Sequence, residues 1–359
     1  MLTSHETILY VDLEAFENNY KYLKKKLNPD TKIIAVVKAY AYGHGDIGIA
    51  KKLSALGVDA LWVADFEEGI ILRRSGITEP VIVANPGAKS HDEIIKYNLE
   101  PVIYNFRLLE IFGENTTTIS VHIKFNTGMN RYGFNLEEIG LLVSKLKEFP
   151  HLKIASICSH LAAADDKSKD PFTQKQFEKF NTICNLFSEK LNINPNRHIL
   201  NTAGVLRFPR QQKEMVRLGI GLYGIGKDDD LKVVGKLVSN VAQIRTLRKG
   251  EGVGYDASFI AKQEMKIAVI PLGYADGINR KLGDGKGGVL INNMSATIIG
   301  KISMDSFMVD ISGINAKEGD LVTVFSEKNS VDDIAKNLDT IPYEILATLN
   351  RRIKRVYLN

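Results

Sequence analysis

The sequence predicts an α/β protein: an N-terminal (β/α)8 barrel of the TIM type, followed by a C-terminal domain that is mostly β-sheet. Three observations support this prediction. Short apolar runs alternate with helical segments over roughly the first 220 residues, as expected of a parallel sheet covered by helices. Eight such runs favour a closed barrel over an open sheet. From about residue 236, strands bounded by glycines replace the alternation.

The barrel strands are expected in the apolar runs, which are rich in valine, isoleucine and leucine. These runs are 32–39, 60–65, 80–85, 101–105, 119–126, 153–160, 197–202 and 215–220. A helix over 12–27 is expected to precede the first of them. A doubly wound sheet is the alternative fold, but no G-x-G-x-x-G motif follows the first run.

The helical segments between these strands begin at residues that favour the N-cap position. The predicted N-caps are Asp46, Asp65, Ser90, Asn105, Asn135 and Asp170. The last of them opens the longest predicted helix, over 170–191.

The second domain is expected to contain strands within 237–255, 265–274, 288–312 and 320–327, a short helix over 331–338 and a basic helical tail over 343–359. We place the domain boundary at the change of pattern, so that residues 1–235 form the barrel domain and 236–359 the β-domain. The first few residues of the chain are expected to pack with the β-domain.

Composition is that of an ordinary globular protein, with 359 residues, 44% of them hydrophobic, and a net charge of +5. Lysines are spread over amphipathic segments such as 20–30, so no stripe for nucleic acid is expected. No apolar run reaches the roughly 20 residues of a membrane span, and the N-terminus lacks the features of a signal peptide. With two isolated cysteines, Cys158 and Cys184, the sequence predicts a cytoplasmic protein with reduced thiols and no membrane partner.

Polar side chains occur at the carboxyl ends of the predicted strands, the end that carries active sites in such barrels. Each of these residues is a weak signal alone. Packing does not explain so many polar residues at one end of a barrel, which we call the barrel mouth. They are Lys38, Arg131, His160, Asn201, Thr202 and Arg217, and Gly219 lies in the last of these strands.

Two of these strand ends predict a phosphate site. The segments 201–204 and 219–221 supply glycine backbone, a helix start and the Thr202 hydroxyl. Lys38 ends a run that reads as buried, and burial lowers a lysine's pKa toward the neutral amine that forms a Schiff base. A buried lysine beside a phosphate site predicts pyridoxal 5'-phosphate (PLP) as the cofactor, with no metal.

Nine sequence blocks across both predicted domains resemble the alanine racemase family. They are 35–45 (AVVKAYAYGHG), 126–134, 159–166, 201–209, 215–224, 252–259 (GVGYDASF), 271–277, 300–310 and 341–346. The resemblance implies a PLP-dependent isomerase that interconverts L-alanine and D-alanine for peptidoglycan synthesis. It also implies a homodimer in which the β-domain of one chain completes the active site of its partner.

The resemblance implies two catalytic residues on opposite faces of the substrate: Lys38, which would also hold PLP as a Schiff base, and Tyr255. Removing a proton from one face of a planar carbon and returning it to the other needs two such groups. The further cofactor-binding residues would be Tyr42, His160, Asn201, Thr202, Arg217, Gly219, Ile220 and Tyr343.

Within that set, Arg217 would face the pyridine nitrogen, and His160 would pack on the ring and help to hold Arg217. The substrate-binding residues would be Arg131, Tyr274, Met304 and Asp305, with Arg131 close to the substrate carboxylate.

Several positions depart from the family pattern, namely Tyr40, Asn126, Thr202, Leu218 and Pro342. None of them removes a group that the mechanism needs. Lys124 matches a lysine that some members carry carbamylated. If modified, it would be an anion able to orient Arg131; if unmodified, it needs another partner.

Three other functions are open on the sequence alone. A racemase of broader or different preference, such as for serine or lysine, would share the fold, and Tyr40, Ser303 and Met304 would tune its pocket. A PLP decarboxylase of related architecture would place an acidic residue at the pyridine nitrogen, which Arg217 disfavours. A non-catalytic PLP carrier of the single-barrel type would lack residues 236–359.

Overall fold

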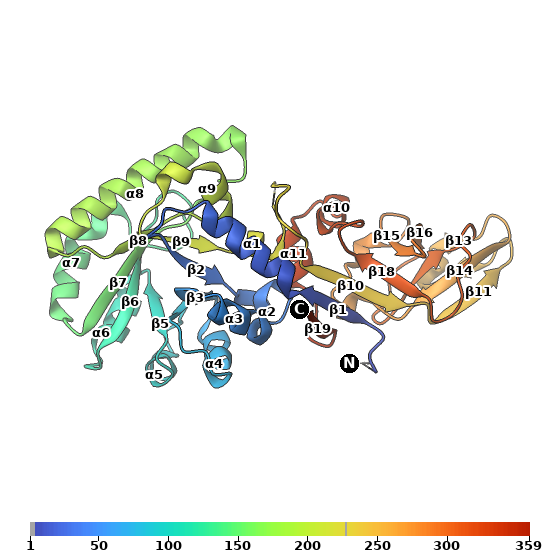
Figure 1. Cartoon of the computed structure of the whole chain (residues 1–359), viewed down its shortest axis with the longest axis horizontal. Coiled ribbons are helices and arrows are strands. Elements are labelled where there is room, and N and C mark those ends of the chain that lie inside the picture. The colour runs from blue at the N-terminus through green and yellow to red at the C-terminus, as the bar shows by residue number, and fades with distance from the viewer. Residues whose placement is uncertain (1–3, 227) are drawn as a thin grey trace. The chain divides into compact units, whose positions relative to one another are not determined.

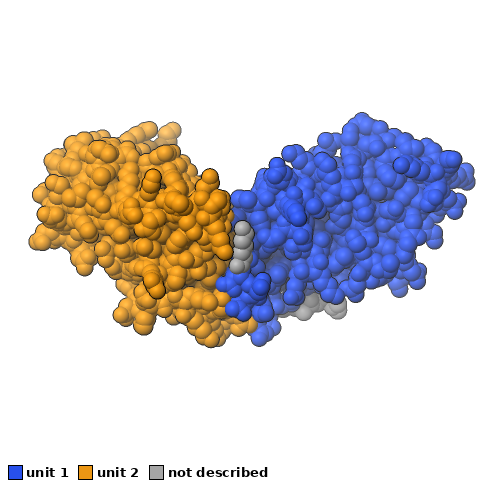
Figure 2. Space-filling model, turned by 90° about the horizontal axis from the view of Figure 1, so that it is seen from above, with its two compact units in different colours: residues 1–16, 40–45, 223–359 blue, residues 17–39, 46–222 orange. Residues whose placement is uncertain are grey.

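The computed structural model describes residues 4–226 and 228–359; Figure 1 shows its elements and Figure 2 its two compact units. Residues 17–39 and 46–222 form the barrel unit. Of the described residues, those within 1–16, 40–45 and 223–359 form the β-unit. The short segment 40–45 therefore belongs to the β-unit although barrel residues flank it on both sides.

Eight parallel strands form the sheet of the barrel unit, in the order β8-β7-β6-β5-β4-β3-β2-β9. The strands are β2 (Lys32–Val36), β3 (Ala60–Val63), β4 (Val81–Val83), β5 (Glu100–Ile103), β6 (Ile119–Lys124), β7 (Leu152–Cys158), β8 (Asn196–His198) and β9 (Met215–Leu218). The Arg217 N–H donates to the Leu200 carbonyl at 3.0 Å and joins the last strand to the segment after β8. The sheet is thus a nearly closed barrel, which confirms the predicted fold class.

Helices follow the strands and pack on the outside of the barrel (Figure 1). After α1 (Leu13–Lys25), which precedes the first barrel strand, they are α3 (Asp46–Ala55), α4 (Phe66–Arg74), α5 (His91–Lys96), α6 (Phe106–Gly113), α7 (Ile139–Glu148), α8 (Asp170–Leu191) and α9 (Thr202–Arg207). In β3 and β4 every residue is buried. Strands enclosed on both faces explain why the sequence shows continuous apolar runs instead of alternation.

Two predicted N-caps are confirmed, because Asp65 and Asn105 accept hydrogen bonds from the N–H groups of Glu68 and Leu108. Asp46 and Asp170 are instead the first helical residues, so these two helices begin one residue earlier than predicted.

Ser90 and Asn135 occupy the N-cap positions predicted for them, but they are bonded in different ways. Ser90 precedes α5, but its hydroxyl donates to the Pro86 carbonyl and does not cap the helix. Asn135 precedes a 3-10 turn, η1 (Leu136–Glu138), which leads into α7.

A nine-stranded sheet organises the β-unit, in the order β11-β14-β17-β16-β15-β18-β10-β1-β19. Its strands are β1 (Ile8–Asp12), β10 (Gly235–Asn240), β11 (Gln243–Leu247), β14 (Met265–Ile270), β15 (Gly288–Ile291), β16 (Met294–Ile299), β17 (Phe307–Asp310), β18 (Leu321–Phe325) and β19 (Lys354–Leu358). The same unit also contains a two-stranded ribbon, β12 (Gly252–Val253) and β13 (Phe259–Ile260), and two helices, α10 (Val331–Asn337) and α11 (Pro342–Ala347).

The predicted helical tail over 343–359 is wrong beyond α11. Residues 354–358 form β19, which pairs in parallel with β1 and joins the two ends of the chain. The sequence around β19 alternates between buried and exposed positions, with Ile353 and Arg355 buried and Lys354 exposed. Pairing with β1 therefore outweighs the helical propensity of the basic residues.

The first predicted strand ends earlier than expected, at Val36, and a left-handed turn follows it. In this turn, α2 (Lys38–Tyr42), the residues Ala39, Tyr40, Ala41 and Tyr42 have φ of 53°, 56°, 51° and 49°. Each costs roughly 1–2 kcal/mol in this conformation. Within the β-unit, Arg355 Nε donates to the Gly43 carbonyl at 2.9 Å, and the Gly45 N–H donates to the Tyr40 carbonyl at 2.8 Å. These bonds offset part of the cost.

Among the residues that the structure describes, no helix combines the length and the apolar character that crossing a membrane requires.

Gly43→Ala is expected to destabilise the chain more than Gly57→Ala. Both glycines have positive φ, +78° and +71°, so alanine costs roughly 1–2 kcal/mol at either position. A Cβ at position 43 would also lie 2.1 Å from the Leu346 carbonyl oxygen, whereas nothing lies within 4 Å of one at position 57. Overpacking should add about 1–3 kcal/mol at position 43. Urea unfolding of both variants measures the difference, and equal losses would contradict the expectation.

Candidate active site

Lys38 lies just beyond β2 and opens the left-handed turn α2. Glu68 of α4 holds the backbone beside it: one carboxylate oxygen accepts from the Ala39 N–H and the other from the Ala64 N–H, both at 2.7 Å. The prediction of a buried strand lysine is wrong, because the residue is exposed in the structure. The strand ends at Val36, two residues before Lys38, and Lys38 lies at the carboxyl end of the strand, as the sequence predicted.

The pKa of Lys38 nevertheless lies below its ordinary value. Partial desolvation by the surrounding barrel residues is the largest cause, and repulsion by Arg131 and Arg217 adds to it, while Glu68 acts in the opposite direction. A lowered pKa increases the fraction of neutral amine, the form that reacts with an aldehyde.

Arg217, on β9, is buried and has only neutral hydrogen-bond acceptors among the described residues. Its Nη1 donates to Nδ1 of His198, and its Nη2 donates to the carbonyls of Ser159 (2.7 Å) and Ile199 (3.1 Å). Burial lowers the pKa of Arg217 to about 10, so the group stays charged at neutral pH.

An aromatic ring covers the Arg217 guanidinium. Its central carbon lies 5.4 Å from the centroid of the Trp62 ring, and the same ring packs edge-on against His198 at 5.9 Å. A desolvated cation over a tryptophan face is stabilised by the ring quadrupole. Trp62 thus helps to hold the cation that has no carboxylate beside it.

His160 accepts from Arg217 through Nδ1, at 3.1 Å from Nη2. Because arginine only donates, this nitrogen carries no proton, so the neutral ring is protonated on Nε2. Burial and the nearby Arg217 cation hold the pKa of His160 well below its usual range, and the same two causes act on His198. The contact with Arg217 is the one predicted for His160.

The predicted phosphate segments meet through a side-chain bond. The Gly219 N–H donates to the Thr202 hydroxyl oxygen at 3.0 Å, and Thr202 is buried at the first position of α9. Asn201 is occupied as the N-cap, where its Oδ1 accepts from the Gly204 N–H at 2.9 Å. Ile220 follows Gly219 and is buried. The Thr202 hydroxyl keeps its own proton available for a ligand.

The extra methyl of Thr202 fixes the residue at position 221. A Cβ at Gly221 would lie 2.4 Å from Thr202 Cγ2, closer than real contacts allow. Glycine at position 221 therefore leaves the space that the threonine methyl at position 202 occupies.

Lys124 and Arg131 share a small pocket with His160. Lys124 ends β6 and is 9% exposed, with its Nζ 5.7 Å from the Tyr132 ring centroid. Burial lowers the pKa of Lys124 to about 8, and repulsion by Arg217 and Arg131 contributes. Arg131 is exposed in the segment after β6. The barrel mouth is thus rich in cations, an environment that suits an anionic ligand.

Two of the predicted cofactor-binding tyrosines contact each other within the β-unit. The rings of Tyr42 and Tyr343 are 5.9 Å apart, and Tyr42 also packs on Tyr223 at 4.9 Å. Burial raises the pKa of Tyr42, so its phenol stays protonated. Tyr343 lies in α11 and is 41% exposed.

Tyr255 lies at a tight turn between β12 and β13 and is 66% exposed. The next two residues, Asp256 and Ala257, have positive φ of 59° and 43°, and the Asp256 carboxylate pairs with Lys301. The ion pair with Lys301 therefore stabilises the turn, while the Tyr255 phenol remains accessible.

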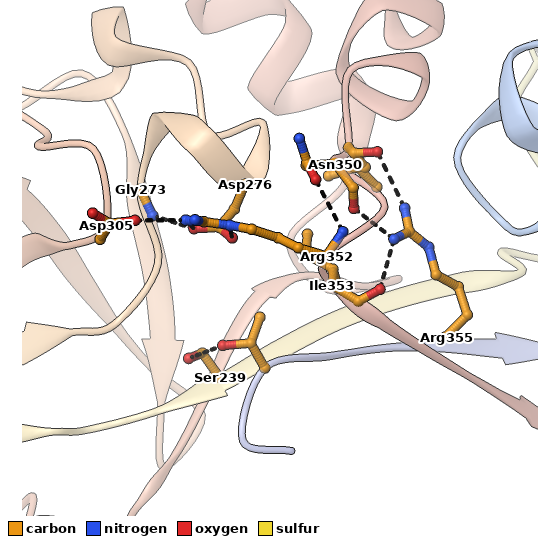
Figure 3. A network of polar contacts seen from close by, with 10 residues as sticks. Ser239, Gly273, Asp276, Asp305, Asn350, Arg352, Ile353 and Arg355 are labelled. Carbon is orange, nitrogen blue, oxygen red and sulfur yellow. Dashed lines mark hydrogen bonds and ion pairs between the residues drawn. The ribbon is translucent and has the colours of Figure 1, made fainter.

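Tyr274, Met304 and Asp305 lie on two loops that are bonded to each other. The Tyr274 N–H donates to the Ser303 carbonyl at 3.1 Å, and the Ala275 N–H donates to the Met304 carbonyl at 3.0 Å. Arg352 reaches both loops, with bonds of 2.9 Å to Asp276 and 2.8 Å to Asp305 (Figure 3). Asp305 is thus an ion-pair partner of Arg352.

Sequence reasoning missed four residues that position these groups: Trp62, Glu68 and His198 in the barrel unit, and Arg352 in the β-unit. Trp62 is the sole tryptophan of the chain and lies in a barrel strand, and His198 lies in the seventh predicted strand. Both positions were visible in the sequence as bulky or polar residues at the barrel end. Glu68 and Arg352 gave no such signal, because their partners are backbone groups or distant loops. Among residues 4–226 and 228–359, no cluster of His, Cys, Asp or Glu is arranged to bind a metal ion.

Comparison with known proteins confirms the family resemblance that the sequence predicts. Residues 11–227 match the model of the alanine racemase N-terminal domain, and residues 234–357 match that of its C-terminal domain. An alanine racemase from Nostoc sp. is 37% identical over 96% of this chain and 94% of its own length. An alanine racemase structure from Clostridium difficile has a TM-score of 0.93 and 32% identity, covering 99% of this chain and 97% of that one.

A third relative carries the cofactor. An alanine racemase from Bartonella henselae, solved with covalently bound pyridoxal phosphate, has a TM-score of 0.90 and 29% identity, covering 99% of this chain and all of that one. Both predicted domains are therefore matched in order and over nearly their full length. The chain belongs to the alanine racemase family.

Proposed function

We propose that this chain is a PLP-dependent alanine racemase that uses Lys38 and Tyr255 as its two acid/base groups and supplies D-alanine for peptidoglycan in the cytoplasm. The observation that carries the proposal is the barrel mouth. There, a lysine of lowered pKa lies among cations, and a buried arginine has only neutral acceptors. The family match and the PLP-bound relative support the same conclusion.

The residues present fit PLP. Lys38 supplies the amine, and the Thr202 hydroxyl and the Ile220 backbone N–H supply donors for a phosphate. Gly219 orients Thr202 through its N–H, and the phenols of Tyr42 and Tyr343 would add donors. Arg217 keeps one donor, its Nε–H, that has no acceptor among the described residues, as a pyridine nitrogen would require. When bound, PLP supplies an aldehyde and an aromatic ring that withdraws electrons from the substrate α-carbon.

Arg217 would hold the ring nitrogen without protonating it, because a guanidinium donates hydrogen bonds and keeps its protons at neutral pH. Lys38 Nζ would remove or return the α-proton on one side, and the Tyr255 Oη would do so on the other. The Arg131 guanidinium would bind the substrate carboxylate. A decarboxylase is disfavoured, because the contacts of Arg217 include no carboxylate.

The exposure of Tyr255 supports a homodimer with shared sites. A phenol used in proton transfer needs a dry and shaped environment, yet in its own unit this side chain is 66% exposed. We propose that Tyr255 and the loops of Tyr274, Met304 and Asp305 complete the site of a partner chain. Symmetric pairs of this kind are the commonest protein oligomers.

The environment of Lys124 supports its carbamylation. A buried lysine whose pKa is lowered to about 8 has a substantial neutral fraction, the form that reacts with carbon dioxide. The modification would replace a cation by an anion in a pocket shared with Arg131. It would therefore relieve repulsion and orient the Arg131 side chain.

Lys38→Ala and Tyr255→Phe are each expected to lower alanine racemisation by about 10²–10⁴-fold. Purified protein with PLP is incubated with L-alanine, and loss of optical activity is followed. The matched controls Lys25→Ala and Tyr97→Phe should keep normal rates. Full activity in both site variants would contradict the two-base proposal, and faster turnover of serine or lysine than of alanine would contradict the assigned substrate.

Mixing Lys38→Ala and Tyr255→Phe chains tests the shared site. If each site takes Lys38 from one chain and Tyr255 from the other, a mixed dimer has one intact site. After unfolding and refolding together, the mixture should regain roughly one quarter of the wild-type activity, because half the dimers are mixed. If both residues come from the same chain, no activity returns. Wild-type chains refolded in the same way give the reference.

The stability of the unmodified chain is expected to rise as pH increases from about 8 to 10.5 through the titration of Lys124. The pKa of this lysine is lowered from 10.5 to about 8 in the folded state. The folded chain therefore releases the proton first, and the cost of the buried cation, present in full below pH 8, is lost. The gain should be roughly 3 kcal/mol.

Urea unfolding of the cofactor-free chain across this pH range, with Lys124→Met as the control that lacks the gain, measures the effect. Labelled bicarbonate should give a carbamate carbon signal in the wild type that is absent from Lys124→Met. An identical pH profile for both chains would contradict the lowered pKa.

A further inference from the structure

A line of hydrogen bonds connects Arg217 to a carboxylate through the interior of the barrel unit. Arg217 Nη1 bonds to Nδ1 of His198, and Nε2 of His198 lies 2.9 Å from the Ser156 hydroxyl. That hydroxyl lies 2.7 Å from Nδ1 of His122, whose Nε2 lies 2.9 Å from the Glu100 carboxylate. These five residues are the interior relay.

The interior relay crosses the barrel from one end toward the other. Glu100 is the first residue of β5, and its side chain is 21% exposed. His122 and Ser156 face each other in the register of β6 and β7, whereas His198 pairs with Cys158, two residues further along. The three middle residues are 2% exposed or less. The relay thus begins at an accessible strand start and ends at the mouth.

The direction of every bond in the relay follows from its two ends. Arginine can only donate, so Nδ1 of His198 must accept and its neutral ring carries the proton on Nε2. A carboxylate can only accept, so Nε2 of His122 must donate. Its Nδ1 accepts, because the Ser156 hydroxyl already accepts from His198 and has no other acceptor for its own proton among the described residues. The hydroxyl of Ser156 then accepts from His198 and donates to His122.

Arg217 and Glu100 therefore impose the same donor-to-acceptor direction on the series, from His198 through Ser156 to His122. One serine can fill the middle position, because its hydroxyl both accepts and donates. Every polar atom of the three middle residues is paired in this arrangement, and hydrogen bonds in such a series polarise one another. A histidine whose Nε2–H lost its acceptor in this core would pay the cost of an unsatisfied buried donor. The ring could recover that bond only by turning its Nδ1 away from Arg217.

We propose that Glu100, His122 and Ser156 are positioning residues for Arg217. They hold His198 as the Nε2–H tautomer, with the lone pair of Nδ1 directed at the guanidinium. The relay also links the buried cation to a carboxylate that lies three neutral groups away. No anion in direct contact with Arg217 therefore competes with a ligand. This inference deepens the proposed function, since it assigns residues that orient the group proposed to face the pyridine nitrogen.

Nitrogen-15 NMR tests the relay directly, because protonated and unprotonated ring nitrogens differ strongly in chemical shift. The full chain, loaded with PLP and labelled at its seven histidines, is measured in the solid state. His122→Asn and His198→Asn assign the signals. We expect both histidines to be neutral with the proton on Nε2. A proton on Nδ1 of His198, or a charged ring at either position, would overturn the proposal.

Ser156→Ala and Glu100→Leu test the effect on Arg217. In both variants we expect a mixture of His198 tautomers and a fall in kcat/KM of about ten-fold, the effect of one unsatisfied buried donor. Glu100→Gln retains an acceptor oxygen and should behave as the wild type. Ser239→Ala is the control for Ser156, since Ser239 is also fully buried and bonds to Thr7 outside the relay.

The outcomes separate this inference from the proposed function. A single wild-type-like tautomer and rate in both Ser156→Ala and Glu100→Leu would overturn the relay, as would equal losses in Glu100→Leu and Glu100→Gln. If Ser156→Ala fails to fold, the two Glu100 variants still decide. If the wild type does not racemise alanine, the proposed function fails, while the tautomer spectrum still reports on the relay.

Discussion

The charge of the barrel mouth depends on how one buried guanidinium is bound: the groups that accept its hydrogen bonds are all neutral. A carboxylate beside Arg217 would neutralise it and occupy the mouth with negative charge. Carbonyls and histidine nitrogens instead accept from its two Nη atoms and leave its charge in place. Burial is the main cause of the lowered pKa of Lys38 and Lys124, and the Arg217 charge adds to it; the same two causes keep His160 and His198 neutral. The binding of this arginine by neutral groups thus adds to the effect of burial on every titratable group around it.

A second constraint acts on the backbone beside Lys38. Four consecutive residues adopt a left-handed conformation that L-amino acids avoid, so the turn needs bonds from elsewhere. It is bonded within the β-unit, where Arg355 donates to the Gly43 carbonyl and the Tyr357 hydroxyl donates to that of His44. Strain of this kind is stored at functional sites when the surrounding structure determines it. The conformation of residues 40–45 is therefore supported by residues near the C-terminus of the same unit.

The sequence was sufficient to predict the barrel, the β-domain and the family, because continuous apolar runs and family blocks are local patterns. It was insufficient wherever a distant pairing decides the outcome. The tail beyond α11 became a strand because β1 pairs with it, and Lys38 became exposed because a turn, and not the strand, follows Val36. Ser156 and His122 read as isolated polar residues in apolar runs, since only the register of β6 and β7 brings them together. The roles assigned to the site residues remain predictions.

The close approach of Thr202 to Gly221 couples these two positions. A Cβ at 221 would collide with the threonine methyl at 2.4 Å, whereas a serine at 202 would remove that collision. A residue larger than glycine at 221 is therefore expected to cost more stability beside threonine than beside serine. The effects of substitutions at the two positions should thus not be additive.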